Sequence, residues 1–294
     1  MPSRSPVGVI HQATAGIRRS ALRRQLQSVA AGKSTALSID LDQAGVDVGE
    51  AIEEITNRLP MESMPVQRLV FAFKRSGTAD RVVERLAAKS PQQRARSARV
   101  VGALQRTEAV SWLAALLGSL DRAVSDAAAR ALGKIGGARS ATALVLAIQR
   151  RGLNRRLVAE LARAAPDLFV EVALTEPQRP AVRPALAIAA GLRRRQTAVG
   201  PLIGLLERGS RRERVIGCRA LGWIGSRTAI PIITRALGDR DWKIRMSAVK
   251  ALGALRARTV KDDLRYLQID RNARVRKAAN MALARLNRGN AHGA

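Results

Sequence analysis

CRALGWIG, at residues 218–225, is the stretch that decides the fold, because close variants of it recur along the chain. The related segments are RALGKIG at 130–136, VKALGAL at 249–255 and MALARL at 281–286. The central apolar residue of this phrase, which we call the anchor, returns at steps of 29 or 31 residues. The anchors are Val101, Leu132, Leu161, Ala190, Leu221, Leu252 and Leu283. A fixed period of this kind is typical of a protein built from structural repeats.

The residues around each anchor follow the spacing of a helix. Apolar side chains recur three positions before and three positions after most anchors, as Cys218 and Ile224 do around Leu221. Steps of three and four residues lie on one face of a helix, whereas a strand would alternate at every second residue. This face must be covered, so the seven anchors and Cys218 are predicted to be buried.

A second helix is predicted after most anchors. Its segments are bounded by Gly, Asp or Pro and cover residues 109–120, 140–150, 197–209, 228–239 and 259–270. One pair of short helices cannot bury its apolar face alone, so successive pairs must stack. We therefore expect an all-α solenoid of seven helix pairs, or of eight if a weaker copy near Val70 belongs to the series.

Two segments, SRRERVIGCRALGWIG at 210–225 and DRDWKIRMSAVKALGAL at 239–255, resemble HEAT repeats, in particular the bacterial type first associated with phycobilin lyases. The shared pattern is a polar or acidic turn, then V/I-R, then A-x-A-L-G. The resemblance implies a right-handed superhelix in which the V-R helix lines the concave surface. It is weaker at 152–177 and 178–209, where several prolines interrupt the pattern.

Residues 1–64 do not fit the repeat, which we place at 65–288. Residues 1–33 hold six basic residues and no acid, whereas residues 34–59 hold six acids and one Arg. The first part is predicted to be a basic arm, either mobile or a short amphipathic helix. The second part is predicted to be a short acidic capping helix, which a solenoid needs at its end. Residues 289–294 are predicted to be a disordered tail.

The charge balance is informative about partners rather than about the fold. The chain carries 52 Lys and Arg against 23 Asp and Glu, a net charge of +29. Such an excess favours nucleic acid, an acidic protein or an anionic membrane surface as the partner. The single cysteine allows no internal disulfide, and no apolar run reaches the roughly 18–20 residues that span a bilayer. We therefore expect a cytoplasmic protein.

Basic residues concentrate at positions −9, −2 and +2 relative to the anchor, on the side of the first helix that faces away from it. Of these 21 sites ten are basic and none is acidic, whereas random placement would give about four basic sites. We call the predicted surface, including one tryptophan that lies on it, the basic ridge. Its members are Arg99, Arg130, Lys134, Arg163, Arg212, Arg219, Trp223, Lys243, Lys250, Arg274 and Arg285.

A further arginine recurs seven positions before the anchor, as Arg94, Arg183, Arg214, Arg245 and Arg276. Seven residues return a helix to nearly the same face, about 20° away from the anchor. These side chains are therefore predicted to be partly buried where repeats meet. Hydrogen bonding to neighbouring turns is the favoured interpretation, with ligand contact as the alternative.

No constellation in the sequence predicts a catalytic, metal or cofactor site. The two histidines, His11 and His292, lie near the ends of the sequence, so neither a zinc site nor a Ser-His nucleophile pair can be assembled. The segment AAGKST at 30–35 resembles the end of a phosphate-binding loop, with Lys33 and Ser34 in the Gly-Lys-Ser positions. It lacks the earlier glycine and the preceding apolar strand that such a loop needs, so a flexible basic loop is favoured.

The three tryptophans invite a comparison with the HEAT-like alkylpurine DNA glycosylases, which combine tryptophans with an aspartate. Only Trp242 has acids nearby, Asp239 and Asp241, and these fall in a turn where HEAT repeats carry Asp for structural reasons. A HEAT-like enzyme of the glycosylase or lyase type is therefore an alternative and not the leading interpretation.

The leading interpretation is a non-enzymatic scaffold whose basic groove holds a polyanionic partner, without any cofactor. That partner is either an acidic protein or the phosphate backbone of nucleic acid. The scarcity of aromatic residues argues against single-strand binding by base stacking and favours a duplex or structured RNA. Contact of residues 1–33 with an anionic membrane is a further alternative.

Overall fold

The computed structural model describes residues 6–41, 47–56, 59 and 63–288, and within them it contains helices and no strand. The predicted tail at 289–294 lies outside the described residues. The α-helices are α1 (Pro6–Ala30), α2 (Val48–Thr56), α3 (Met64–Arg75), α4 (Thr78–Glu84), α5 (Pro91–Ala103), α6 (Val110–Leu116), α7 (Arg122–Ile135), α8 (Gly137–Arg151), α9 (Arg155–Ala164), α10 (Asp167–Thr175), α11 (Val182–Leu192), α12 (Val199–Arg208), α13 (Arg211–Ile224), α14 (Ile230–Arg235), α15 (Trp242–Ala254), α16 (Lys261–Tyr266) and α17 (Ala273–Arg288).

Short 3-10 helices accompany many of these elements. They extend the C-terminal ends of α4, α14 and α16 or lead into α6, α12, α14 and α16. Their bounds are η1 (Arg85–Ala87), η2 (Thr107–Ala109), η3 (Gln196–Ala198), η4 (Arg227–Ala229), η5 (Ala236–Gly238), η6 (Arg258–Val260) and η7 (Leu267–Ile269). The predicted fold class, an all-α solenoid, is confirmed.

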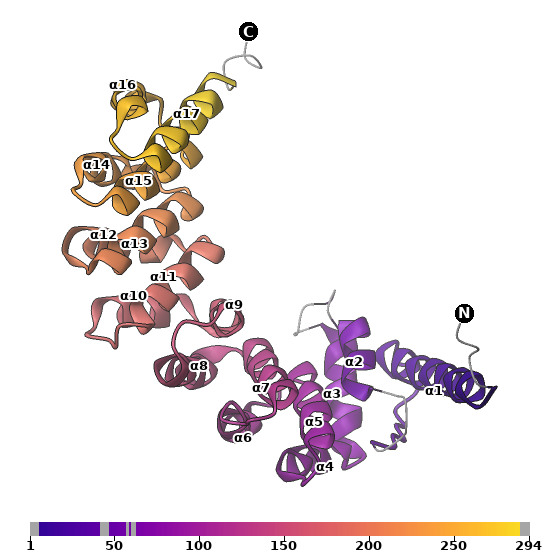
Figure 1. Cartoon of the computed structure of the whole chain (residues 1–294). Helices are drawn as coiled ribbons and strands as arrows, with labels where there is room; N and C mark the ends of the chain where they lie inside the picture. Colours follow the sequence, from indigo (N-terminus) through magenta and orange to yellow (C-terminus); the bar gives the residue numbers. More distant parts are fainter. Residues whose placement is uncertain (1–5, 42–46, 57–58, 60–62, 289–294) are drawn as a thin grey trace. The chain divides into compact units, whose positions relative to one another are not determined.

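The chain divides into two compact units, Met1–Ala143 and Leu144–Ala294. In the second unit the anchor-bearing helices α9, α11, α13, α15 and α17 pack side by side in chain order and form what we call the first layer. The helices that follow them, α10, α12, α14 and α16, pack against this layer and form the second layer (Figure 1). The predicted alternation of first and second helices is therefore present.

In the first unit, α5 and α7 carry anchors and pack against each other, and α6 packs on α7. The helix that packs next to α5 is α2, and α2 in turn packs on α1. The weaker repeat copy expected near Val70 falls in α3, which packs on α1, and Val70 itself is only half-buried whereas Leu69 is fully buried. The acidic helix α2 thus takes the place next to α5 that the sequence had suggested for a repeat around Val70.

The anchors form the core, as predicted. Each of the seven is buried, with exposed fractions between 0% for Leu221 and 8% for Leu283. Cys218, one turn before Leu221, is also fully buried, and loss of solvation raises the pKa of its thiol to about 12. A thiol with that pKa stays protonated at neutral pH, so Cys218 serves as a small apolar side chain of the core.

The polar turn before most anchor-bearing helices supplies the N-cap of the helix. Eleven positions before the anchor, Ser90, Asp121, Ser210, Asp241 and Asn272 accept hydrogen bonds from the first-turn backbone N–H groups of α5, α7, α13, α15 and α17. A side-chain oxygen at this position satisfies backbone donors that the helix leaves open and stabilises it by about 1 kcal/mol.

The arginine seven positions before the anchor binds the end of the preceding helix or the turn that follows it. Arg94, Arg183, Arg214, Arg245 and Arg276 all donate hydrogen bonds to backbone carbonyls of the preceding helix end or turn. Arg214 also pairs with Asp239 of the next repeat, and Arg245 pairs with Asp270 at 2.7 and 2.9 Å. The hydrogen bonds from Arg245 outweigh burial and hold the pKa of Asp270 below its ordinary value. The structural interpretation of these arginines is confirmed.

Successive anchor-bearing helices are held together by close contacts between a glycine and an alanine. The glycine directly after one anchor faces the alanine directly before the next one. A Cβ built on Gly102 would lie 2.6 Å from Ala131 Cα, and one built on Gly222 would lie 2.9 Å from Ala251 Cα. Gly253 has the same relation to Ala282. The recurring A-L-G triplet thus encodes a helix contact that no larger side chain fits.

Replacing Gly102 with alanine tests this contact. Within a helix this change normally stabilises by about 1 kcal/mol, because glycine has the lower helix propensity. Here we expect destabilisation by about 1–3 kcal/mol, because the new methyl group meets the backbone of α7. The measurement is urea unfolding followed by circular dichroism. Gly16 in α1, whose Cβ would meet nothing within 4 Å, is the matched control and should gain stability as Gly16→Ala. An equal gain for Gly102→Ala would contradict the close approach.

The residue four positions after most anchors ends the first helix with a positive φ. Gly136 and Gly225 have φ of 70° and 84° there, and Gln105, Arg194 and Arg256 occupy the same position with φ of 48°, 52° and 51°. The final glycine of ALGKIG and ALGWIG is therefore the residue best suited to this helix end. Side chains at such angles cost roughly 1–2 kcal/mol.

Changing Arg256 to glycine should therefore stabilise the protein. The relief of backbone strain exceeds the entropy that glycine adds to the unfolded chain, so we expect a net gain of about 0.5–1 kcal/mol in the free energy of unfolding. Lys261, which has φ of −58°, is the control, and Lys261→Gly should lower stability. The two variants are compared by thermal and urea unfolding, and a loss of stability in Arg256→Gly would refute the strain argument.

Candidate basic pocket on the first layer

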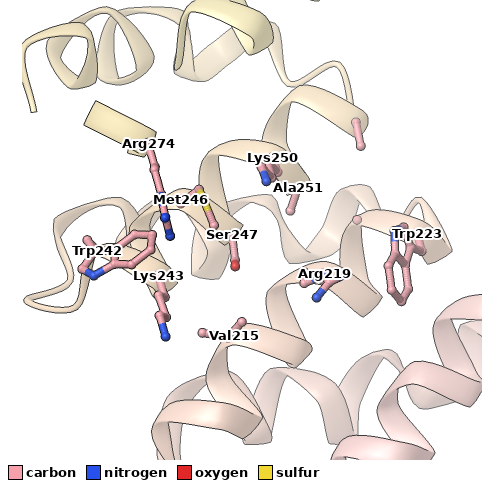
Figure 2. A pocket seen from close by; sticks show the side chains of 12 residues that line it. Val215, Arg219, Trp223, Trp242, Lys243, Met246, Ser247, Lys250, Ala251 and Arg274 are labelled. Atoms are coloured by element: carbon pink, nitrogen blue, oxygen red, sulfur yellow. The ribbon is translucent and has the colours of Figure 1, made fainter. Parts of the chain in front are cut away.

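Side chains from α13, α15 and α17 surround a pocket of about 460 Å³ on the first layer of the second unit. Its apolar lining comes from Val215, Met246, Ala251, Ala254 and the two indoles of Trp223 and Trp242. Figure 2 shows the two tryptophans at opposite ends, with Met246 and Ser247 between them. This volume lies within the range of about 300–1,000 Å³ that is common for ligand sites.

Four basic residues line the same pocket, and all belong to the predicted basic ridge: Arg219, Lys243, Lys250 and Arg274. They come from three successive repeats, so the stacking of α13, α15 and α17 brings them together. All four are exposed. Trp223, the aromatic member of the ridge, also lines the pocket and is 38% exposed.

The tryptophans hold several of these cations in place. The guanidinium carbon of Arg219 lies 5.1 Å from the centroid of the Trp223 ring, and that of Arg274 lies 5.2 Å from the Trp242 ring. The Lys243 ammonium is 5.6 Å from Trp242. Each arrangement stabilises the cation by about 0.5–1 kcal/mol at an exposed site and leaves its other side open to a ligand.

No carboxylate lines the pocket, and among the described residues none forms an ion pair with its four basic side chains. The acids of the adjoining turn are engaged elsewhere. Asp241 caps α15 and pairs with Arg211, and although burial acts against it, these hydrogen bonds keep the pKa of Asp241 below its ordinary value. Asp239 pairs with Arg214. Both acids near Trp242 therefore have structural roles, as the turn position had suggested.

Three other members of the ridge are neutralised by acids of the chain itself. Arg99 pairs with Asp47, Lys134 pairs with Glu53 at 2.8 Å, and Arg163 pairs with Glu160 at 2.9 Å. The first two acids belong to the segment that leads into α2 and to α2 itself, which packs on α5. None of the 21 register positions is acidic, but these three ridge members have acidic partners at other positions of the chain. The repeat register could not predict the pairs with Asp47 and Glu53, because α2 and the residues before it lie outside the repeat.

The remaining ridge members, Arg130, Arg212 and Arg285, are exposed and lie outside the pocket lining. The basic residues of α1 are also partly paired. Arg19 pairs with Glu50 at 3.2 Å and with Glu54 at 2.6 Å, and Arg23 is 3.7 Å from Glu54. Several of the described basic residues are thus paired with acids of the chain, whereas four of them line the pocket, which has no carboxylate in its lining.

The predicted ridge contains five of the twelve residues that line the pocket and misses seven, among them three with large side chains. Val215 and Met246 occupy position −6, and Trp242 occupies position −10. Position −6 is three residues after −9 and four before −2, so it shares their face of the helix. This spacing was available in the sequence and could have identified Val215 and Met246. Trp112 lies in α6 of the first unit, away from the other two tryptophans in sequence, and is 50% exposed.

Other candidate motifs do not form sites in the structure. Lys33 and Ser34 follow the helix α1, whereas a phosphate-binding loop follows a strand. Among the described residues no three His, Cys, Asp or Glu side chains cluster closely enough to hold a metal ion. Of the described helices, none combines the length and the apolar character that a bilayer crossing requires.

Two stacked layers of short helices in repeating pairs define an α-solenoid. A sequence model of HEAT repeats matches residues 79–164 and 205–284, which is more than half of the chain, and the chain belongs to this family. The protein is thus a helical repeat scaffold. The match does not identify the phycobilin-lyase type.

No curated protein matches the sequence. Among solved structures, human deoxyhypusine hydroxylase in complex with glycerol is similar at 17% identity, with a TM-score of 0.38, over 97% of this chain and 100% of that one. An engineered protein is similar at 20% identity and a TM-score of 0.38, over 72% of this chain and 99% of that one. Another engineered protein is similar at 19% identity and a TM-score of 0.37, over 93% of this chain and 85% of that one. The family assignment rests on the repeat match and not on these structures.

Proposed function

We propose that this protein is a non-enzymatic binding scaffold that holds a polyanionic partner on the first layer of its second unit. The observation that carries the proposal is the pocket in which Arg219, Lys243, Lys250 and Arg274 converge without a carboxylate. The partner supplies the missing negative charges, either as carboxylates of an acidic protein or as phosphates of nucleic acid.

Local convergence supports the proposal better than the net charge of +29 does. At physiological ionic strength the screening length is about 8 Å, so basic residues spread over the surface act almost independently. Four cations around one pocket act on the same ligand group. The diffuse charge raises the association rate, and the pocket determines where the partner stays.

The cation–π contacts also favour binding. A free arginine side chain loses about 2 kcal/mol of rotamer entropy when a ligand immobilises it. Arg219 and Arg274 already lie over indole rings, so part of this loss has occurred before the partner arrives. Pre-ordered guanidinium groups are suited to carboxylates and phosphates, which they bind through paired N–H donors.

A quadruple charge reversal tests the proposal. The variant Arg219→Glu, Lys243→Glu, Lys250→Glu and Arg274→Glu should reduce binding to both heparin and polyglutamate at least about 100-fold, because each reversal replaces an attraction with a repulsion. The measurement is fluorescence anisotropy at low salt, with helicity checked by circular dichroism. Outward-facing side chains contribute little to packing, so the fold should persist.

The control makes the same number of reversals on the second layer and its turns, at Arg208, Arg227, Arg235 and Arg258. All four are exposed and lie in the same unit. This variant should lose less than about tenfold, since it changes the net charge equally but leaves the pocket intact. Equal losses from the two variants would show that binding depends on diffuse charge, and the proposed site would be rejected.

Salt dependence gives an independent measurement on duplex DNA. If the four pocket cations each contact a phosphate, the logarithm of the association constant should fall against the logarithm of salt concentration with a slope of about −3 to −4. The quadruple pocket variant should lose most of this slope and the second-layer variant should keep it. A slope that is the same in all three proteins would contradict a role for the pocket.

A further inference from the structure

The basic pocket has an apolar floor as well as a cationic rim, and the two need different ligand groups. Val215, Met246 and Ala254 add aliphatic surface to the lining that the indoles of Trp223 and Trp242 share. Met246 is unbranched and flexible, which allows it to adapt to side chains of different shapes. A purely charged partner would cover the rim and leave this apolar surface in contact with trapped water.

The distribution of paired cations restricts the kind of polyanion. A duplex presents phosphates along a line, with one charge per about 1.7 Å of helix axis, and would use basic residues on many successive repeats. On this chain Arg99, Lys134 and Arg163 already pair with the chain's own acids. The unpaired group around the pocket spans three repeats, which suits a short acidic segment better than a long regular one.

The two features together are matched by a peptide. A segment with several Asp or Glu residues around one aliphatic side chain would place carboxylates on Arg219, Lys243, Lys250 and Arg274 and the aliphatic group on Met246. The indoles at the two ends of the pocket would cover the flanking backbone (Figure 2). Tryptophan and arginine are the residue types that contribute most often to such binding sites.

We propose that the pocket binds an acidic peptide segment of a partner protein, and that one apolar side chain of this peptide enters the pocket. This inference rests on the proposed function, because it specifies the polyanion that the same site holds. It requires the apolar side chain of the peptide to raise the affinity beyond what the charges give. Burying a leucine side chain in such a pocket corresponds to roughly 10- to 100-fold in the association constant.

The experiment uses three fluorescein-labelled probes of about a dozen units each. The first is a peptide of Asp and Glu with one central Leu, the second carries Gly in place of that Leu, and the third is a single-stranded oligothymidylate. Anisotropy titrations give the dissociation constants. In a Trp112→Phe background the intrinsic fluorescence reports on Trp223 and Trp242, which both line the pocket.

A variant fills the pocket without changing its charge. Ala254 is exposed and lines the pocket, so Ala254→Trp should fill part of the pocket while the protein stays folded. We expect the Leu peptide to bind the unmodified protein at least about tenfold more tightly than the Gly peptide, with a change in tryptophan fluorescence. In Ala254→Trp this ratio should fall to about one, while the affinity for the Gly peptide remains.

Equal affinities of the unmodified protein for the two peptides would show that the apolar side chain contributes nothing. That result would overturn the peptide proposal and leave the polyanion-binding function standing. Tighter binding of the oligothymidylate than of the Leu peptide, lost on filling the pocket, would also overturn the peptide assignment, because the occupant would then be a nucleobase. Absence of binding for all three probes at low salt would reject both the peptide and the proposed function.

Discussion

The structure depends on the contact between the glycine after one anchor and the alanine before the next. This contact recurs between α5 and α7 and between successive helices from α11 to α17. Because neither residue has a side chain beyond Cβ, the two backbones can approach closely, and the anchors on either side fill the space around them. A larger residue at either position would separate the helices and open the core along the whole contact.

The same contact explains why a binding site forms on this layer. Helices that approach closely bring the side chains at positions −9, −6 and −2 of neighbouring repeats within reach of one another. Gly222 and Ala251 themselves line the pocket, so their small size leaves room for it. Their sequence neighbours Trp223 and Lys250 carry longer side chains and line the same pocket. The repeat thus supplies the pocket without an additional loop or domain.

Sequence alone predicted the elements that depend on local periodicity. The buried anchors, the helix pairs and the arginine seven residues before the anchor follow from a spacing that repeats, and each repeat confirms the others. It could not predict which basic residues would be neutralised. Lys134 pairs with Glu53, which lies 81 positions earlier in a helix outside the repeat, and only tertiary packing brings them together. The predicted repeat copy near Val70 is absent for a related reason, because α3 has helical spacing but packs on α1.

The repeat separates what stabilises this protein from what it presents to a partner. Anchors, caps, the −7 arginines and the glycine–alanine contacts stabilise the helices and their stacking, and in a stacked array each repeat depends mainly on its neighbours. The outward positions −9, −2 and +2 contribute little to this packing, so their residues can differ from repeat to repeat at small cost. Leu192, Trp223 and Ala254 occupy the same position in three successive repeats. Four cations and two indoles on one part of such a surface increase repulsion and exposed apolar area without strengthening the fold. A binding role accounts for that combination, because a partner with carboxylates and an apolar group relieves both.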